Sequence, residues 1–305
     1  MLVNTKELLS DCYKNGYAVG AFNFSNMEQL QAIIKAHENK NHPVIVACSK
    51  SAMDYMGVEM CVSMVKTIAE KSPIKIALHL DHGADFEICK KAIDNGFTSV
   101  MIDASSLPLE ENIAATKKVV EYAHNHVPYV TVEAELGKLS GIEDEVNVAN
   151  SHYTNPDEAK YFVEKTGVDS LAVSIGTSHG AYKFAGESRL EINILEEIRK
   201  KTNLPLVLHG ASSIPQYLVE EFNSLGGQLG NAKGVDEDNL REAIKHGITK
   251  INVDSDCRIA MVLGIKKALL DPKLFDPRKV IGKGKEEMIT LIENKIENVY
   301  KANLK

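Results

Sequence analysis

The chain has 305 residues, of which 44% are hydrophobic and 25% are charged, and this composition excludes a disordered protein. Its 35 Lys and Arg against 42 Asp and Glu give a formal charge of −7, so we expect no general binding to nucleic acid or to an anionic membrane. No apolar run approaches the ~18 residues that span a bilayer, and the first residues lack the pattern of a signal peptide. Five scattered cysteines without a C-x-x-C pair favour a reducing cytoplasm.

Eight short apolar runs are predicted to be strands. In chain order they lie at 18–22, 44–47, 74–78, 99–102, 129–132, 170–173, 204–208 and 248–251. Their continuous apolar character is typical of parallel strands buried on both faces. Stretches with helical spacing lie between them, and Asn155-Pro156 is typical of a helix start. Eight β/α repeats with right-handed crossovers predict a (β/α)8 barrel, with an open doubly wound sheet as the alternative.

No composition break or linker divides the chain, so we expect one domain over residues 1–305. Residues 281–305 follow the last repeat and are expected to form a C-terminal helical extension. Two connections are long, at 136–155 and at 221–240. The first is polar and contains glycine, which is typical of a mobile lid.

Every predicted strand ends in polar residues, and in a barrel the carboxyl ends of the strands carry the catalytic groups. These ends supply, in chain order, Asn23, Ser49, Asp81-His82-Gly83, Asp103, Glu133 and Glu135, residues 176–180, residues 209–212 and residues 252–255. Three of the histidines, His82, His179 and His209, would converge at the mouth with a fourth position open, which is typical of a catalytic zinc site.

Three carboxylates accompany these histidines. Asp81 would stay ionised near a cation and could act as a base, and its alternative role is to orient His82. Asp103 and Glu135 would bind a second cation, order the histidines or cap loops. A Schiff-base mechanism on Lys75 or Lys250 is a less favoured alternative.

The small residues after strands six to eight predict a phosphate site, because their backbone N–H groups can approach an anion. They are Gly180, Gly210, Ala211, Ser212, Asp254 and Ser255, and their alternative role is to form plain turns. Among the remaining histidines, His37 and His42 are expected at the surface, and His79 is expected to be a buried, hydrogen-bonded neighbour of the site.

These motifs resemble class II, zinc-dependent fructose-1,6-bisphosphate aldolases of the shorter, bacterial-type branch. The resemblance rests on residues 20–24, 80–83, 132–137, 176–180, 208–212 and 252–256, which occur in order and at consistent spacing. It implies a metal-dependent aldehyde-lyase of glycolysis and gluconeogenesis. Such an enzyme reversibly cleaves fructose 1,6-bisphosphate to dihydroxyacetone phosphate and glyceraldehyde 3-phosphate.

The resemblance also implies roles for single residues. Zinc would bind His82, His179 and His209, and Asp103 with Glu135 would match a second divalent-metal position. Asp81 would be the acid/base at the C4 hydroxyl, and Glu143 would move the proton at C3 of dihydroxyacetone phosphate. The substrate phosphate would bind near a monovalent cation, at Gly180, Lys183, Gly210, Ser212 and Ser255. Asn252 would contact the enediolate, and Arg258 would reach the site of a neighbouring subunit in a homodimer or homotetramer.

The sequence departs from the family pattern at Ser51, Ala84-Asp85 and Ser255. Tagatose-bisphosphate relatives tend to lack the acids that stand here as Asp254 and Asp256, so the resemblance favours fructose over its C4 epimer. Two other readings stay open on the residues alone: a barrel metallohydrolase and a non-catalytic barrel that binds phosphorylated ligands. The lack of a His-x-His motif after the first strand counts against the hydrolase.

Overall fold

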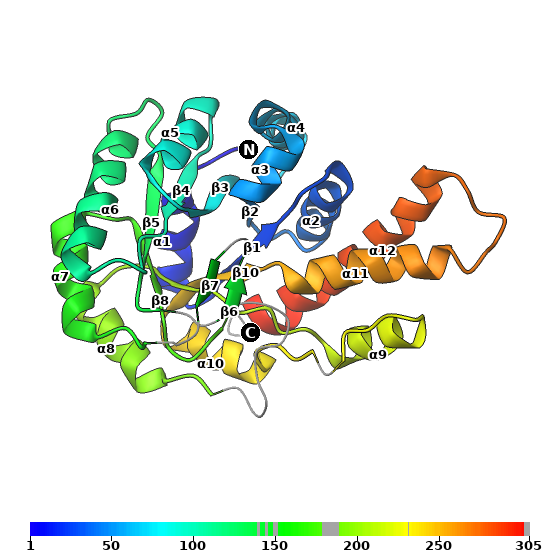
Figure 1. Cartoon of the computed structure of the whole chain (residues 1–305). Helices are drawn as coiled ribbons and strands as arrows, with labels where there is room; N and C mark the ends of the chain where they lie inside the picture. The colour runs from blue at the N-terminus through cyan, green and yellow to red at the C-terminus, as the bar shows by residue number, and fades with distance from the viewer. Residues whose placement is uncertain (139–140, 144–145, 149–151, 179–188, 231, 302–305) are drawn as a thin grey trace.

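The computed structural model of the chain confirms the (β/α)8 barrel (Figure 1). It describes residues 1–138, 141–143, 146–148, 152–178, 189–230 and 232–301. The barrel strands are β1 (Val19–Asn23), β2 (Val44–Ser49), β3 (Ile76–Gly83), β4 (Ser99–Ile102), β5 (Thr131–Leu136), β8 (Ser170–Val173), β9 (Leu206–Leu208) and β10 (Ile248–Val253). All neighbours pair in parallel, and β1 pairs with both β2 and β10. That last pairing closes the barrel and excludes the open sheet.

Helices surround the strands. They are α2 (Met27–Asn39), α3 (Lys50–Met56), α4 (Val58–Lys71), α5 (Phe86–Asn95), α6 (Leu109–His124), α7 (Pro156–Thr166), α8 (Ile192–Thr202), α9 (Gln216–Ser224) and α10 (Glu237–Lys245). The predicted start of α7 is confirmed, because the Asn155 side chain accepts hydrogen bonds from the backbone N–H groups of Asp157 and Glu158.

A further helix, α1 (Thr5–Asn15), precedes the first strand and closes one end of the barrel. Its buried side chains pack with Val19 and Ala21 of β1 in a small apolar cluster. The Thr5 hydroxyl also contacts those of Ser99 and Thr131, the first residues of β4 and β5. α1 therefore covers the amino-terminal ends of the strands, and the carboxyl ends stand at the opposite mouth.

Two helices extend away from the barrel, α11 (Ser255–Ala268) and α12 (Pro277–Lys295) (Figure 1). α12 packs against α11 and α2 and continues into a π-helical turn, η1 (Ile296–Tyr300). Within the long connection at 136–155, the strands β6 (Gly141–Glu143) and β7 (Val146–Val148) form an antiparallel pair. None of the helices in the described ranges is both long and apolar enough to cross a bilayer.

The expectation that His37 and His42 lie at the surface is wrong. Both are buried between α2, β1 and η1, with the rings of Phe22 and Tyr300 as neighbours. The C-terminal turn η1 covers this part of α2, and the sequence spacing around residue 40 does not reveal that contact.

Candidate active site

The end of β3 presents two consecutive side chains, Asp81 and His82, to the same region. Successive side chains of a regular strand point to opposite faces. Here the pairing of β3 with β4 shifts between Leu80 and Gly83, and His82 has a left-handed backbone with φ 49°. Such a bulge redirects a side chain. As a result, ligand atoms of Asp81, His82 and His209 all lie within 4.8 Å of one another.

The Asp81 carboxylate is held by two amides. Its Oδ2 accepts a hydrogen bond from Asn23 Nδ2 at 2.9 Å, and its Oδ1 accepts one from Asn252 Nδ2 at 2.9 Å. Burial alone would raise the pKa of Asp81, but nearby positive charge, led by that of His82, holds this pKa at about 2. Asp81 is therefore a carboxylate at neutral pH. The Oδ1 atoms of Asn23 and Asn252 are buried and have no hydrogen-bond partner among the described residues.

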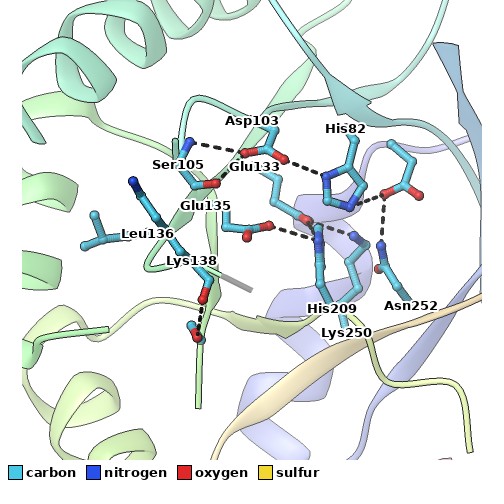
Figure 2. A network of polar contacts seen from close by, with 12 residues as sticks. His82, Asp103, Ser105, Glu133, Glu135, Leu136, Lys138, His209, Lys250 and Asn252 are labelled. Carbon is cyan, nitrogen blue, oxygen red and sulfur yellow. Dashed lines mark hydrogen bonds and ion pairs between the residues drawn. The ribbon is translucent and has the colours of Figure 1, made fainter. Parts of the chain in front are cut away.

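Each of the two histidines at the mouth contacts a carboxylate (Figure 2). His82 Nδ1 lies 2.8 Å from Asp103 Oδ2, and His209 Nε2 lies 2.8 Å from Glu133 Oε1. The two ring centroids are 4.7 Å apart. Metal-binding histidines use such a carboxylate to fix the tautomer and the orientation of the ring.

A second group of possible ligands overlaps the first, because His82, Asp103 and Glu135 also bring ligand atoms within 4.8 Å of one another. Glu135 Oε2 lies 3.2 Å from His209 Nδ1, and this buried oxygen makes no hydrogen bond of good geometry in the described part of the chain. Burial and the charge of Asp103 raise the pKa of Glu135. Imidazole and carboxylate ligands at these spacings fit a divalent cation of the zinc type.

The interior of the barrel next to the mouth holds a buried ion pair of Lys250 with Glu133, and the sequence analysis does not predict that these two residues pair. Lys250 Nζ donates to Glu133 Oε1 at 2.9 Å and lies 3.4 Å from His79 Nε2. The prediction for His79 is confirmed, because its ring is buried and its Nδ1 lies 2.8 Å from Ser99 Oγ. Burial, reinforced by the charge of Lys250, lowers the pKa of His79 to about 3, so its ring is neutral.

These positions contradict the Schiff-base alternative. A lysine nucleophile needs a free amine that faces the substrate. The Lys250 amine is fully buried and forms an ion pair with Glu133. Lys75 lies outside the barrel, half exposed, with its Nζ 3.5 Å from Glu7.

The loops after β9 and β10 meet beside the metal-ligand candidates. Ser212 Oγ is buried and accepts a hydrogen bond from the Asp254 backbone N–H at 3.3 Å. Ser255 begins α11, so the amino-terminal end of that helix lies at this edge. Asp254 accepts from Arg258 Nε at 2.8 Å, and the Arg258 side chain is largely exposed.

The remaining predicted site residues either have other contacts or lie outside the described part of the chain. Ser49 caps α3 by accepting from the Ala52 backbone N–H at 3.3 Å. Ala211 packs its side chain into the apolar core, so it can offer only backbone groups to a ligand. Glu143 lies in β6, but its side chain is outside the description, as are His179, Gly180 and Lys183.

Comparisons with known proteins agree with this arrangement. A family model described as fructose-bisphosphate aldolase class-II matches residues 3–304. The chain is 47% identical to a fructose-bisphosphate aldolase of Helicobacter pylori over 99% of both chains. It is 46% identical to one of Treponema pallidum over 98% of this chain and 96% of the relative.

Solved structures of aldolases share the fold of this chain. The YdjI aldolase of Escherichia coli K12 superposes with a TM-score of 0.80 at 31% identity and 97% coverage of each chain. A fructose-bisphosphate aldolase of Campylobacter jejuni, at 22% identity and a TM-score of 0.76, shares the fold. The barrel, the clustered histidines and carboxylates, and these matches together show that the chain belongs to the class II fructose-bisphosphate aldolase family, a family of aldehyde-lyases.

Proposed function

We propose that the chain reversibly cleaves fructose 1,6-bisphosphate into dihydroxyacetone phosphate and glyceraldehyde 3-phosphate, with zinc as its metal. The observation that carries this proposal is the Asp81 carboxylate, clamped by Asn23 and Asn252 beside His82 and His209. An aldol cleavage needs a base for the hydroxyl whose carbon becomes the aldehyde, and an electrophile near the ketone oxygen. Asp81 can serve as this base, and the histidines and carboxylates beside it can hold a metal ion that serves as the electrophile.

The metal would be held by His82, His179 and His209, with Asp103 and Glu135 as a second divalent position. A bound divalent ion would supply Lewis-acid stabilisation of the negative charge on the ketone oxygen. Two contacts support this assignment, because Asp103 and Glu133 each hold the ring of one ligand histidine at 2.8 Å. A divalent ion would also neutralise part of the negative charge that Asp81, Asp103 and Glu135 gather at the mouth.

Asp81 would take the proton of the C4 hydroxyl during cleavage and return it during condensation. The two amides leave its carboxylate little freedom to rotate, so the same oxygen meets each substrate. The buried Oδ1 atoms of Asn23 and Asn252 are suited to accept hydrogen bonds from substrate hydroxyls. Glu143 would move the proton at C3, and Ser49 would complete the substrate contacts.

The substrate phosphate would bind where the loops after β9 and β10 meet. Gly210, Ala211, Ser212 and Ser255 would contribute backbone N–H groups and hydroxyls, together with Gly180 and Lys183. A monovalent cation would bind beside it. Ser212 supports this assignment. Its Oγ accepts a hydrogen bond from the Asp254 N–H, so its own O–H can donate to a phosphate oxygen.

The chain would work as a homodimer or homotetramer in the cytoplasm, as one domain over residues 1–305. Arg258 would reach the second phosphate in a neighbouring subunit. Its side chain is 64% exposed and forms a surface pair with Asp254, which supports this role. All five cysteines are buried and free of disulfides, which fits a reducing compartment. Light scattering of the purified enzyme measures the oligomer size directly.

A coupled assay for triose phosphate, with fructose and tagatose bisphosphates as parallel substrates, tests the proposal. We expect a preference for fructose, complete loss of activity with a chelator, and recovery when zinc is restored. Borohydride should not trap the substrate on the enzyme. Covalent trapping together with indifference to chelators would contradict the metal mechanism, and a tagatose preference would contradict the substrate alone.

A further inference from the structure

The loop between β9 and α9, residues 209–215, has a strained backbone. Ile214 has φ 44°, whereas the φ of 58° at Gly210 is one that glycine adopts readily. A positive φ is unusual for a β-branched residue, because its side chain clashes with its own backbone. Ile214 is nevertheless fully buried in the core. Other parts of the structure must therefore hold this loop in place.

A buried carboxylate on α11 holds the backbone at the strained position. Asp256 Oδ1 accepts a hydrogen bond from the Ile214 N–H at 3.1 Å, and Asp256 Oδ2 accepts one from the Ser213 N–H at 3.3 Å. Asp256 is completely buried. Its side chain therefore faces the loop rather than the substrate, and both oxygens of one carboxylate fix two consecutive peptide groups.

The counter-charge for this carboxylate comes from the far end of the chain. Lys295, the last residue of α12, places its Nζ 2.5 Å from Asp256 Oδ2 and also donates to Ser213 Oγ. Its side chain is 3% exposed. Two ions buried to this extent are stable only as a pair with further hydrogen bonds. Ser213 provides one of these bonds, and its Oγ in turn lies 3.3 Å from Glu237 Oε1 of α10.

The neighbouring residues of the same loop are those that we assign to the substrate phosphate. Ser212 lies directly before Ser213, with its carbonyl accepting from the Val235 N–H at 3.0 Å. A shift of the Ser213 and Ile214 peptides would move Ser212 and Gly210, since the chain between them has few free torsions. The geometry of residues 210–214 thus depends on the ion pair of Asp256 with Lys295, which would not itself touch the substrate.

We infer that Lys295 is a positioning residue which, through Asp256, sets the loop of residues 210–214 for phosphate binding. The C-terminal helix α12 is then part of the substrate site, although it lies outside the eight β/α repeats. The inference rests on the proposed function in one respect, namely that this loop binds the substrate phosphate. A purely structural Lys295 would anchor α12 and leave substrate affinity unchanged.

The test compares the zinc-loaded wild type with the Lys295→Met variant, well below the melting temperature of both. We expect KM for fructose 1,6-bisphosphate and Kd for dihydroxyacetone phosphate, measured by calorimetry, each to rise about tenfold. The kcat at saturation should stay within about twofold, because the acid/base and metal residues are untouched. Zinc content should not change. Lys295→Arg, which keeps a buried donor cation, should recover most of the affinity.

Lys267→Met is the matched control, because Lys267 joins α11 to Glu221 and Glu287 in a more exposed ion pair. It should leave both constants unchanged. If Lys295→Met does not fold, the Asp256→Asn/Lys295→Met double variant removes both buried charges. A single amide oxygen cannot replace both carboxylate contacts, so the affinity should still fall.

Two results would overturn the inference, and they are distinguishable. Wild-type enzyme that binds dihydroxyacetone phosphate, with an unchanged Kd in the folded Lys295 variants, would make Lys295 an anchor of α12 only. Wild-type zinc enzyme that fails to bind dihydroxyacetone phosphate would remove the phosphate assignment itself.

Discussion

Two pairs of histidines with little or no exposed surface show how differently the same side chain can be used. At the barrel mouth, His82 and His209 each contact a carboxylate at 2.8 Å. Between α2 and η1, the Nδ1 atom of His37 lies 2.7 Å from the Ile33 carbonyl, and that of His42 lies 2.9 Å from the Pro43 carbonyl. The Nε2 atoms of the second pair are buried without a hydrogen-bond partner in the described ranges.

The difference lies in the charge that each environment favours. Burial lowers the pKa of His37 to about 3 and that of His42 to about 4, with neighbouring Lys301 adding to the effect in both. Burial acts in the same direction on His82, but Asp81 and Asp103 outweigh it and raise its pKa to about 10. Burial alone thus leaves a packing histidine neutral, whereas carboxylates beside a ring of low exposure favour its charged form.

The largest expected effect is at the Asp81 carboxylate, which we propose as the acid/base. Asp81→Ala should lower kcat by ~10²–10⁴, because a general acid/base is lost, while zinc content and substrate affinity persist. Steady-state kinetics with metal analysis measures both. An unchanged kcat would reduce Asp81 to an orienting partner of His82.

A smaller effect should follow from weakening the carboxylate contact of His209, which we propose as a zinc ligand. Glu133→Gln should reduce zinc affinity by ~10–100-fold, the usual consequence of losing a carboxylate behind a ligand histidine. A competition titration with a chelating dye measures the affinity independently of activity. Glu38→Gln, a surface carboxylate that accepts from Ser72 Oγ, is the control and should bind zinc normally. Equal affinities in the two variants would show that Glu133 does not order His209.

The buried pair of His37 and His42 should make the free energy of unfolding depend on pH. The folded-state pKa values of His37 and His42 lie below the unfolded value of 6.5, so below that pH the unfolded chain binds more protons. The free energy of unfolding should therefore fall as pH drops from 6.5 toward 4, by about 1.4 kcal/mol per pH unit for each histidine. Urea unfolding of wild type and His42→Phe at pH 7.5 and 5 measures this, and the variant should lose less stability. An equal loss in both would mean that His42 already binds a proton in the folded state.

The smallest effect is expected where a histidine contacts carboxylates at a partly exposed position. His246 lies 2.7 Å from Glu196 and 2.9 Å from Glu242, and all three side chains are partly exposed. His246→Gln should change the free energy of unfolding at pH 7 by less than about 1 kcal/mol, because water screens such pairs. Urea unfolding measures it. A larger loss would show that carboxylate pairing matters without burial.

The sequence predicts the barrel because its eight runs are apolar on both faces, and the strands differ from the predicted runs mainly at their ends. It also predicts the mouth residues, because polar groups follow each run. The roles of Glu133 and Lys250 were missed, although each lies two residues before a residue assigned to the site, Glu135 and Asn252. Side chains two apart on a strand share a face, so this alternation is a usable signal. The contact between Asp256 and Lys295 joins segments whose proximity no local pattern encodes.

The bulge at the end of β3 limits how this site could be transferred to another barrel. A designer who copies only the adjacent Asp81 and His82 onto a regular strand would turn one of them out of the barrel. The graft must also carry the left-handed backbone of His82 and the glycine after it, because a Cβ at Gly83 would lie 2.6 Å from the Met101 carbonyl oxygen. What must be transferred is therefore the backbone conformation of the bulge, which orients both side chains. A search for new scaffolds should match that conformation before it matches residues.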